Sequence, residues 1–152
     1  VKNLYLKKSF QSIIAKKLKI KTKPNFKGEV KKKLLEKKEN LKKLEKVVHP
    51  FVRREMLIFT KRYKNKKFLF FEIPLLIESK LVKYFDTTIF IKANRKMRLK
   101  RYLKAGGNVK IFNFLDKNQL KDVYKMKFCD HVVVNNETQS VLKKKLMNII
   151  TK

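Results

Sequence analysis

Three short runs of apolar and β-branched residues, without polar alternation, constrain the fold of this chain more than any other feature. They occupy residues 68–71, 87–91 and 132–134. A continuous apolar run of this length is typical of a parallel strand that is covered on both faces. Segments with helical periodicity separate the runs from one another. The sequence therefore predicts an α/β layer sandwich built on a parallel sheet.

The segment before the first apolar run has helical patterns throughout. Apolar residues spaced three and four apart predict an amphipathic helix over residues 3–19. A helical face then continues through residues 30–48, and we expect a break near 37–39. Pro24 and Gly28 are expected to form a loop between these two segments.

A proline defines our expectation for the next helix. Pro50 suits the first turn of a helix, where its missing N–H costs little. We expect this helix to end near Tyr63. Because residues 1–65 show helical patterns alone, they are predicted to form a helical region, and residues 66–152 are predicted to form the remainder of a single domain.

The second half of the chain carries clear signals for the ends of its helices. Asn94 is expected to cap a helix over residues 95–105, which Gly106 and Gly107 end. One further helix is expected to hold the apolar residues between 111 and 123. The pair Asn135-Asn136 is expected to turn the chain into a last helix, which carries Val141, Leu142, Leu146, Ile149 and Ile150.

Composition excludes several classes of protein. With 43% hydrophobic residues and 12 Phe, the chain has enough apolar material for a core and is not a disordered basic tail. It contains no apolar run long enough to cross a bilayer and no visible secretory signal. The single cysteine, Cys129, rules out an intramolecular disulfide framework and fits a reducing cytoplasm. We therefore expect a cytoplasmic protein that does not act in a membrane.

The net charge of +30 has two interpretations. The chain holds 36 Lys but only 6 Arg, spread along its whole length. This distribution favours a compositional drift on solvated faces. It also leaves open a basic protein of RNA or ribosome surfaces, although such proteins commonly use arginine for forked contacts. In either case we expect non-specific binding to polyanions that falls steeply with salt.

Glycine is scarce, and this limits nucleotide chemistry. The three glycines, Gly28, Gly106 and Gly107, do not form GxxxxGK[ST] or GxGxxG, the loops that cradle phosphates. The first residue is Val1 rather than methionine. We therefore expect the sequence to be processed or to be a fragment of a longer protein, with any phosphate-binding loop outside it.

Four segments, in order, resemble the dephospho-coenzyme A kinase family. They are VHPFVR at 48–53, EIPLLIE at 72–78, LKR at 99–101, and Gln119 followed by CDHVVVNN at 129–136. The family has a His-Pro helix, a "PLLxE" loop after a strand, a "Lys-Arg" helix, a lid helix with Gln, and an "Ala-Asp-x-Val-Ile-x-Asn" strand. The "IPLLIE" loop is the most specific of these motifs.

This resemblance implies a fold and a reaction. The fold is a P-loop kinase-like three-layer sandwich with a parallel sheet, a helical substrate-binding subdomain and a lid at about residues 100–128. The reaction transfers the γ-phosphoryl group of ATP, with Mg²⁺, to the ribose 3′-hydroxyl of dephospho-CoA. The family's first strand and Walker A loop are expected before Val1, so we expect this chain alone to be inactive, poorly stable and monomeric.

The resemblance also suggests residues for the nucleotide side. Arg101 matches the family's lid arginine and is the expected catalytic and nucleotide-binding residue, because an arginine can neutralise charge on the transferred phosphoryl group. Gln119 matches the lid glutamine and is expected to bind nucleotide. Glu72 is expected near Mg²⁺. Lys125 or Lys127 is expected to approach the nucleotide. Each of the first and third assignments has a structural alternative. Arg101 is then a residue on the exposed surface of a helix, and Glu72 is a charged residue at the solvent-facing end of a strand.

On the substrate side the resemblance suggests His49, Pro74, Glu78 and Lys33. Lys33, with Lys31 beside it, is expected to meet the phosphates of the coenzyme A moiety. Each residue also has a structural explanation. A lone histidine is commonly a structural residue, Pro74 ends a strand, and a lysine in this chain commonly lies on a solvated face.

Two departures from the family leave another function open. Ala105 stands where the family often has a second arginine, and Gly106-Gly107 replaces residues that are often acidic. These changes weaken the expectation of lid catalysis. The sequence thus leaves three hypotheses: a dephospho-CoA kinase without its N-terminal segment, a basic RNA- or ribosome-associated protein, and a paralogue that keeps the substrate half without phosphoryl transfer.

Overall fold

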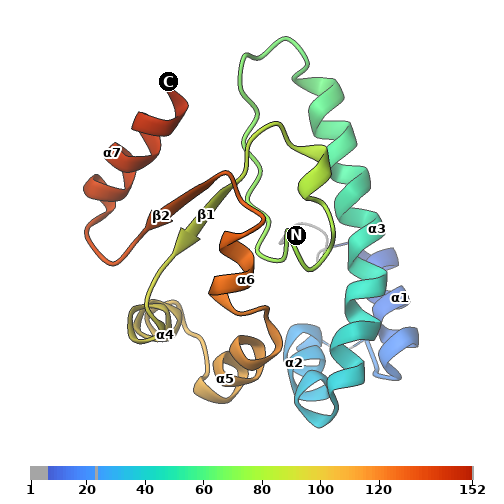
Figure 1. Cartoon of the computed structure of the whole chain (residues 1–152). Coiled ribbons are helices and arrows are strands. Elements are labelled where there is room, and N and C mark those ends of the chain that lie inside the picture. The colour runs from blue at the N-terminus through green and yellow to red at the C-terminus, as the bar shows by residue number, and fades with distance from the viewer. Residues whose placement is uncertain (1–6, 23, 152) are drawn as a thin grey trace. The chain divides into compact units, whose positions relative to one another are not determined.

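The computed structural model describes residues 7–22 and 24–151. Its chain divides into two compact units, Val1–Glu72 and Ile73–Lys152. Helices alone form the described part of the first unit, whereas the second unit combines helices with a small parallel sheet (Figure 1). This mixed α/β organisation with a parallel sheet is the fold class that the sequence predicts.

The first unit contains three helices: α1 (Lys8–Leu18), α2 (Phe26–Glu36) and α3 (Lys38–Arg62). Helices α1 and α2 both pack against α3 (Figure 1). The predicted helix at 3–19 is confirmed where it is described, and residues 3–6 lie outside that part. The predicted break is also confirmed, because Lys37 has extended backbone angles (φ −150°, ψ 138°) between α2 and α3.

The core of the first unit forms where α1 meets α3. The side chains of Phe10 and Ile14 are completely buried. The ring of Phe10 meets that of Phe51 edge-on, with 5.0 Å between centroids, a geometry that aromatic pairs prefer. The remaining buried apolar residues are Ala15, Leu18, Phe26, Val30, Leu34 and Leu44.

Two expectations for the first unit are wrong. Gly28 lies within the first turn of α2 instead of in a loop, and Pro24 and Asn25 lie in a turn directly before this helix. Pro50 lies in the middle of α3 and does not start a helix. Apolar packing along the 25-residue helix outweighs the loss of one backbone hydrogen bond at the proline.

The apolar run at 68–71 is not a strand, which corrects the first of the three predicted strands. Its backbone belongs to no sheet in the described part of the chain. The side chains of Phe68 and Phe70 are 51% and 64% exposed, so the run is not covered on both faces. An apolar sequence favours extension, but a strand also needs a neighbour that completes its hydrogen bonds.

The other two predicted strands are confirmed. β1 (Ile89–Lys92) and β2 (His131–Val134) run parallel, side by side in Figure 1, with Ile89 opposite His131 and Lys92 opposite Val134. Val133 is the buried residue of β2. The connection between the strands contains helices, as a parallel pair requires.

Four α-helices and one short 3₁₀ helix complete the described part of the second unit. α4 (Arg95–Lys104) begins after its predicted cap Asn94, whose side chain accepts a hydrogen bond from the backbone of Met97. α7 (Gln139–Ile150) packs against β2. The other elements are α5 (Val109–Asn118), α6 (Asp122–Met126) and the 3₁₀ helix η2 (Val82–Tyr84).

The single helix that we expect around residues 111–123 is instead two. α5 ends at Asn118, and Gln119 and Lys121 have extended backbone angles, with ψ of 155° and 145°. The hydrophobic spacing continues across this break, which explains why the pattern predicts one helix. Within the described residues, no helix has the length and apolar character needed to cross a membrane.

Candidate functional site

The carboxyl ends of β1 and β2 define the candidate site of the second unit. In open α/β sheets, ligands bind outside this edge of the parallel strands. The chain leaves β1 at Lys92 and β2 at Val134. The backbone N–H of Asn135 donates to the carbonyl of Lys92 at 2.7 Å, and that of Asn94 donates to Oδ1 of Asn136 at 2.8 Å. These two bonds hold the two loops side by side.

Arg101 reaches this same edge from α4. Its Nη1 donates to the carbonyl of Asn135 at 2.8 Å, and its Nη2 donates to that of Glu137 at 3.3 Å. Arg101 is exposed and makes no ion pair among the interactions of the described residues. Its charge therefore stays available to an anion, while its position is fixed by the loop after β2.

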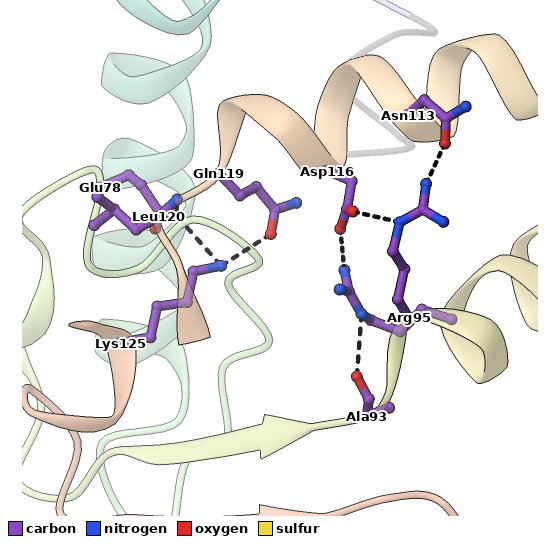
Figure 2. Close-up of polar contacts among 9 residues, drawn as sticks. Glu78, Ala93, Arg95, Asn113, Asp116, Gln119, Leu120 and Lys125 are labelled. Carbon is purple, nitrogen blue, oxygen red and sulfur yellow. Dashed lines mark hydrogen bonds and ion pairs between the residues drawn. The ribbon is translucent and has the colours of Figure 1, made fainter. Parts of the chain in front are cut away.

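The other two arginines of α4, Arg95 and Arg98, form ion pairs with one carboxylate. Arg98 Nη1 lies 2.5 Å from Asp116 Oδ1, and Arg95 Nε lies 3.1 Å from Asp116 Oδ2 (Figure 2). Arg98 also donates from Nε to the carbonyl of Ala93 at 3.1 Å. The guanidinium groups of Arg95 and Arg98 lie 5.4 and 6.0 Å, respectively, from the centre of the Phe112 ring. These contacts connect α4 to α5.

Three of the residues that the resemblance suggests meet at one place: Glu78, Gln119 and Lys125. Lys125 Nζ donates to Gln119 Oε1 at 2.9 Å and lies 3.3 Å from Glu78 Oε1 (Figure 2). Glu78 Oε1 also accepts a hydrogen bond from the backbone of Leu120 at 3.1 Å. The structure thus brings Glu78 and Gln119 together on Lys125, whereas the contacts of Arg101 are with the loop after β2.

The segment around Glu78 is a tight turn over residues 74–80 that Pro74 opens. Pro74 is exposed at its start. Ser79 is buried, and its hydroxyl donates to the carbonyl of Leu75 at 2.6 Å. Lys80 takes the left-handed conformation (φ 57°) as the turn ends. The turn therefore places Glu78 through backbone geometry instead of through a regular element.

Glu72 does not end a strand, because the preceding run belongs to no sheet; this corrects the position that we expect for it. Its side chain is exposed. Across residues 7–22 and 24–151, no group of three or more His, Cys, Asp or Glu side chains is placed to hold a metal ion. Glu72 by itself offers one carboxylate, and Mg²⁺ in kinase sites is commonly held by one or two carboxylates together with water and substrate phosphates.

The first unit holds the other two candidates. Lys33 Nζ pairs with Glu36 Oε2 at 2.7 Å, and the carbonyl of Lys33 accepts from Asn40 Nδ2 at 2.8 Å. His49 is half-buried on α3, next to Pro50. An open cavity of about 300 Å³ adjoins Lys33; it is lined by Lys19, Ile20, Lys21, Glu29, Lys32, Lys33 and Glu36.

Two groups near the amino ends of the strands have shifted pKa values. Hydrogen bonds from the side chain and then the backbone of Thr88 lower the pKa of Asp130. Burial raises the pKa of the Cys129 thiol. Cys129 is half-buried. Neither group lies at the carboxyl edge of the strands, so neither belongs to the candidate site.

Sequence reasoning missed the residues that position this site. Asp116 and its two arginines were not singled out, although Arg95 and Arg98 lie three residues apart on one helix face. The burial of Lys125 has no signal of its own in a chain with 36 lysines. The lone acidic residue of α5, Asp116, was the available clue.

Comparison with known proteins identifies the family. A family model described as dephospho-CoA kinase matches residues 25–140, which is more than half of the chain. The chain belongs to the dephospho-CoA kinase family. The matched region takes in the His-Pro segment, the 74–80 turn, Arg101 and Gln119.

Curated dephospho-CoA kinases give the same result. The chain is 29% identical over 109 residues to that of Rickettsia typhi, covering 71% of this chain and 57% of the relative. It is 28% identical over 115 residues to the kinase of Rhizobium meliloti, and this match covers 74% of this chain and 59% of the relative. It is 30% identical over 117 residues to the kinase of Fusobacterium nucleatum, and this match covers 74% of this chain and 58% of the relative. The chain thus spans somewhat more than half the length of these relatives.

Proposed function

We propose that the protein to which this chain belongs transfers the γ-phosphoryl group of ATP to the ribose 3′-hydroxyl of dephospho-CoA and forms coenzyme A. The match of residues 25–140 to the dephospho-CoA kinase family carries this proposal. In it, α1–α3 contribute to the coenzyme A side, and the carboxyl edge of β1 and β2, with α4, contributes to the nucleotide side. Cytoplasmic location and a monomeric state belong to the same proposal.

Arg101 is the residue to which we assign charge neutralisation. Phosphoryl transfer depends mainly on positioning and on cations that face the phosphoryl oxygens. Arg101 fits this role because the loop after β2 fixes its side chain, while no carboxylate of residues 7–22 or 24–151 forms an ion pair with it. Arg95 and Arg98 do not fit, because Asp116 already pairs with both.

Glu72 remains the residue that we propose near Mg²⁺. Its side chain is exposed, and no group of three or more His, Cys, Asp or Glu side chains among the described residues is placed to hold a metal ion. A magnesium ion beside Glu72 would therefore take its remaining ligands from water and substrate phosphates. The sequence also lacks a GxxxxGK[ST] loop, so the described residues supply no backbone cradle for the triphosphate.

On the coenzyme A side, we propose that Lys33 and His49 contact the substrate from the first unit. The cavity beside Lys33 supports this assignment, since four of its seven lining residues are lysines. Lys33 is already paired with Glu36, so a phosphate group has to compete with that carboxylate. Pro74 shapes the 74–80 turn and is proposed to act through the backbone.

The test measures ATP-dependent phosphorylation of dephospho-CoA. The chain alone is expected to be inactive, because it has no phosphate cradle. A fusion that places before Val1 the segment of the Rickettsia typhi dephospho-CoA kinase that precedes the matched region is expected to be active. In that fusion, Arg101→Ala is expected to lower kcat about a hundredfold or more, while Lys96→Ala, an exposed lysine of the same helix outside the motif, has little effect. An inactive but folded fusion would overturn the proposal.

A second function rests on the net charge of +30. We propose that the chain also binds RNA non-specifically, through charge alone. The binding constant is then expected to fall steeply between 50 and 200 mM salt, about as strongly for one RNA sequence as for another. Binding that persists at high salt, or that prefers one sequence, would indicate a dedicated RNA site instead.

A further inference from the structure

Lys125 differs from every other described lysine of this chain by its burial. It is only 6% exposed, whereas the other lysines that the structure describes are half-buried or exposed. A lysine ammonium is strongly hydrated, and its burial is rare unless it is paired. The position of Lys125 therefore has a cause in its contacts.

The contacts of Lys125 join three separate segments. Its Nζ meets Glu78 in the 74–80 turn at 3.3 Å and Gln119 at the end of α5 at 2.9 Å. Lys125 itself lies on α6, and its ammonium is 5.9 Å from the ring of Phe90 in β1. Figure 2 shows the lysine between the carboxylate and the amide.

The same carboxylate oxygen also fixes the connection between α5 and α6. Glu78 Oε1 accepts the backbone N–H of Leu120 at 3.1 Å. Residues 119–121 are the extended link that separates the two helices. The link would otherwise expose a free backbone donor, and Glu78 satisfies it. One carboxylate therefore holds both the lysine and the link.

The electrostatics make this arrangement specific. The side chains of Lys125 and Glu78 are 8% and 18% exposed, so little water screens their attraction. Removing either partner leaves a charge that is largely buried and unpaired, which is strongly unfavourable. The pair therefore favours one placement of the turn relative to the link over all others.

We propose that Lys125 is a positioning residue of the kinase, which holds the 74–80 turn against the α5–α6 link and so sets the placement of the lid region. This inference rests on the proposed function. Glu78 and Gln119 then act as the partners of Lys125, and their contribution to substrate or nucleotide binding is indirect. The proposal accounts for two separate family motifs, the "IPLLIE" loop and the lid glutamine, by one shared contact.

The first test uses hydrogen exchange on the chain as it is, so it does not depend on the proposed activity. Lys125→Met keeps an unbranched side chain, one heavy atom shorter, and removes its charge. We expect amide exchange at residues 75–81 and 119–121 to accelerate about tenfold or more, with little change in β1 and β2. Lys125→Arg is expected to restore protection. The matched control is Lys121→Met, an exposed lysine of the same link.

A second variant tests the pairing itself. Glu78→Gln is expected to accelerate amide exchange in the same two segments. The double variant, Glu78→Gln with Lys125→Met, is expected to exchange little faster than Lys125→Met alone, because the two groups act together. Unchanged exchange in Lys125→Met would overturn the proposal. Uniform acceleration that includes residues 89–92 and 131–134 would also overturn it, since it would indicate only a general loss of stability.

The active fusion supplies the catalytic readout. Lys125→Met is expected to lower kcat about tenfold or more while changing the KM for ATP less, since placement of the lid affects the transition state more than ground-state binding. Lys125→Arg is expected to recover most of kcat. Wild-type kcat in Lys125→Met would overturn the proposal. If the fusion has no activity at all, the proposed function fails, and the exchange data still decide the structural part.

Discussion

The carboxylate of Asp130 accepts two hydrogen bonds from Thr88, at 2.7 Å from the backbone nitrogen and 2.6 Å from the hydroxyl. Thr88 directly precedes β1, and Asp130 directly precedes β2. The backbone N–H of Asp130 in turn donates to Thr88 Oγ1 at 3.2 Å. A pair of four-residue strands has few ladder bonds, so these side-chain contacts help to fix the register that places Ile89 opposite His131.

These hydrogen bonds lead to a prediction about pH. They lower the pKa of Asp130 in the folded chain, so their stabilisation is present above the unfolded pKa of about 3.9 and is lost as pH falls through the folded value. Asp130→Asn is therefore expected to be less stable than wild type at pH 7 and to lose less stability on acidification. Thermal unfolding from pH 7 to 3 measures this. If stability falls with pH equally steeply in wild type and Asp130→Asn, the prediction is contradicted. The control is Asp86→Asn, which changes an exposed carboxylate.

The two glycines after α4 are expected to respond differently to substitution. Gly106 has φ +77° with open space around it, whereas a Cβ on Gly107 would lie 2.2 Å from the ring of Tyr102 and 2.6 Å from its carbonyl oxygen. Gly106→Asn is expected to cost less than the change at Gly107, because its strain comes from the positive φ alone and asparagine tolerates the left-handed region better than most residues. Gly107→Ala is expected to cost about 1–3 kcal/mol, because backbone must move. Urea unfolding measures the free energy of unfolding of both variants, and equal losses in the two would contradict this prediction.

The regular elements were largely predictable because their signals are local. Asn94 as a cap and the valines of β2 each act through their immediate neighbours. The run at 68–71 was not predictable in the same way. Its residues favour an extended backbone, but strand formation depends on a partner segment that the local sequence does not specify. The failure at Pro50 has a similar cause, since packing along α3 outweighs a local preference.

The candidate site was predictable in its residues but not in its contacts. The family motifs indicated Glu78 and Gln119, and the structure joins them through Lys125. The resemblance indicated Lys125 or Lys127, but burial is a property of the folded chain, so no sequence pattern shows that Lys125 is the buried one. The same holds for Asp116, whose importance arises only when α5 packs against α4.

The position of Pro50 predicts a stabilising substitution. It lies inside α3, where it removes one backbone hydrogen bond and crowds the preceding turn. Because its side chain is exposed, Pro50→Ala is expected to leave the packing intact and to raise the free energy of unfolding by about 1–3 kcal/mol. Chemical denaturation followed by far-UV circular dichroism measures this. A loss of stability would mean that the proline shapes α3 in a way that its neighbours require.

Cys129 is expected to react slowly with alkylating reagents. Burial raises the pKa of its thiol, and the thiolate is the nucleophile. At pH 8 the folded chain is therefore expected to react with iodoacetamide at least several-fold more slowly than the same chain unfolded in urea, and the rate should keep rising well above pH 9. Mass spectrometry follows the reaction, since Cys129 is the single cysteine. Equal rates for folded and unfolded chain would contradict the prediction.

The last prediction concerns the contact between α4 and α5. Asp116 accepts from both Arg95 and Arg98, and its side chain is 19% exposed. Asp116→Ala is expected to cost about 1–3 kcal/mol, because it removes charge-assisted hydrogen bonds and leaves two cations side by side. Arg98→Ala alone is expected to cost less, since Arg95 still pairs with the carboxylate.

A double-mutant cycle separates this contact from general packing. The variant with both Asp116→Ala and Arg98→Ala is expected to be more stable than the sum of the single effects predicts, by about 1 kcal/mol, because the second change removes a cation that the first left unpaired. Urea unfolding of the four proteins gives the coupling. Strict additivity would show that Asp116 and Arg98 do not depend on each other, and the connection of α4 to α5 would then rest on the Phe112 contacts.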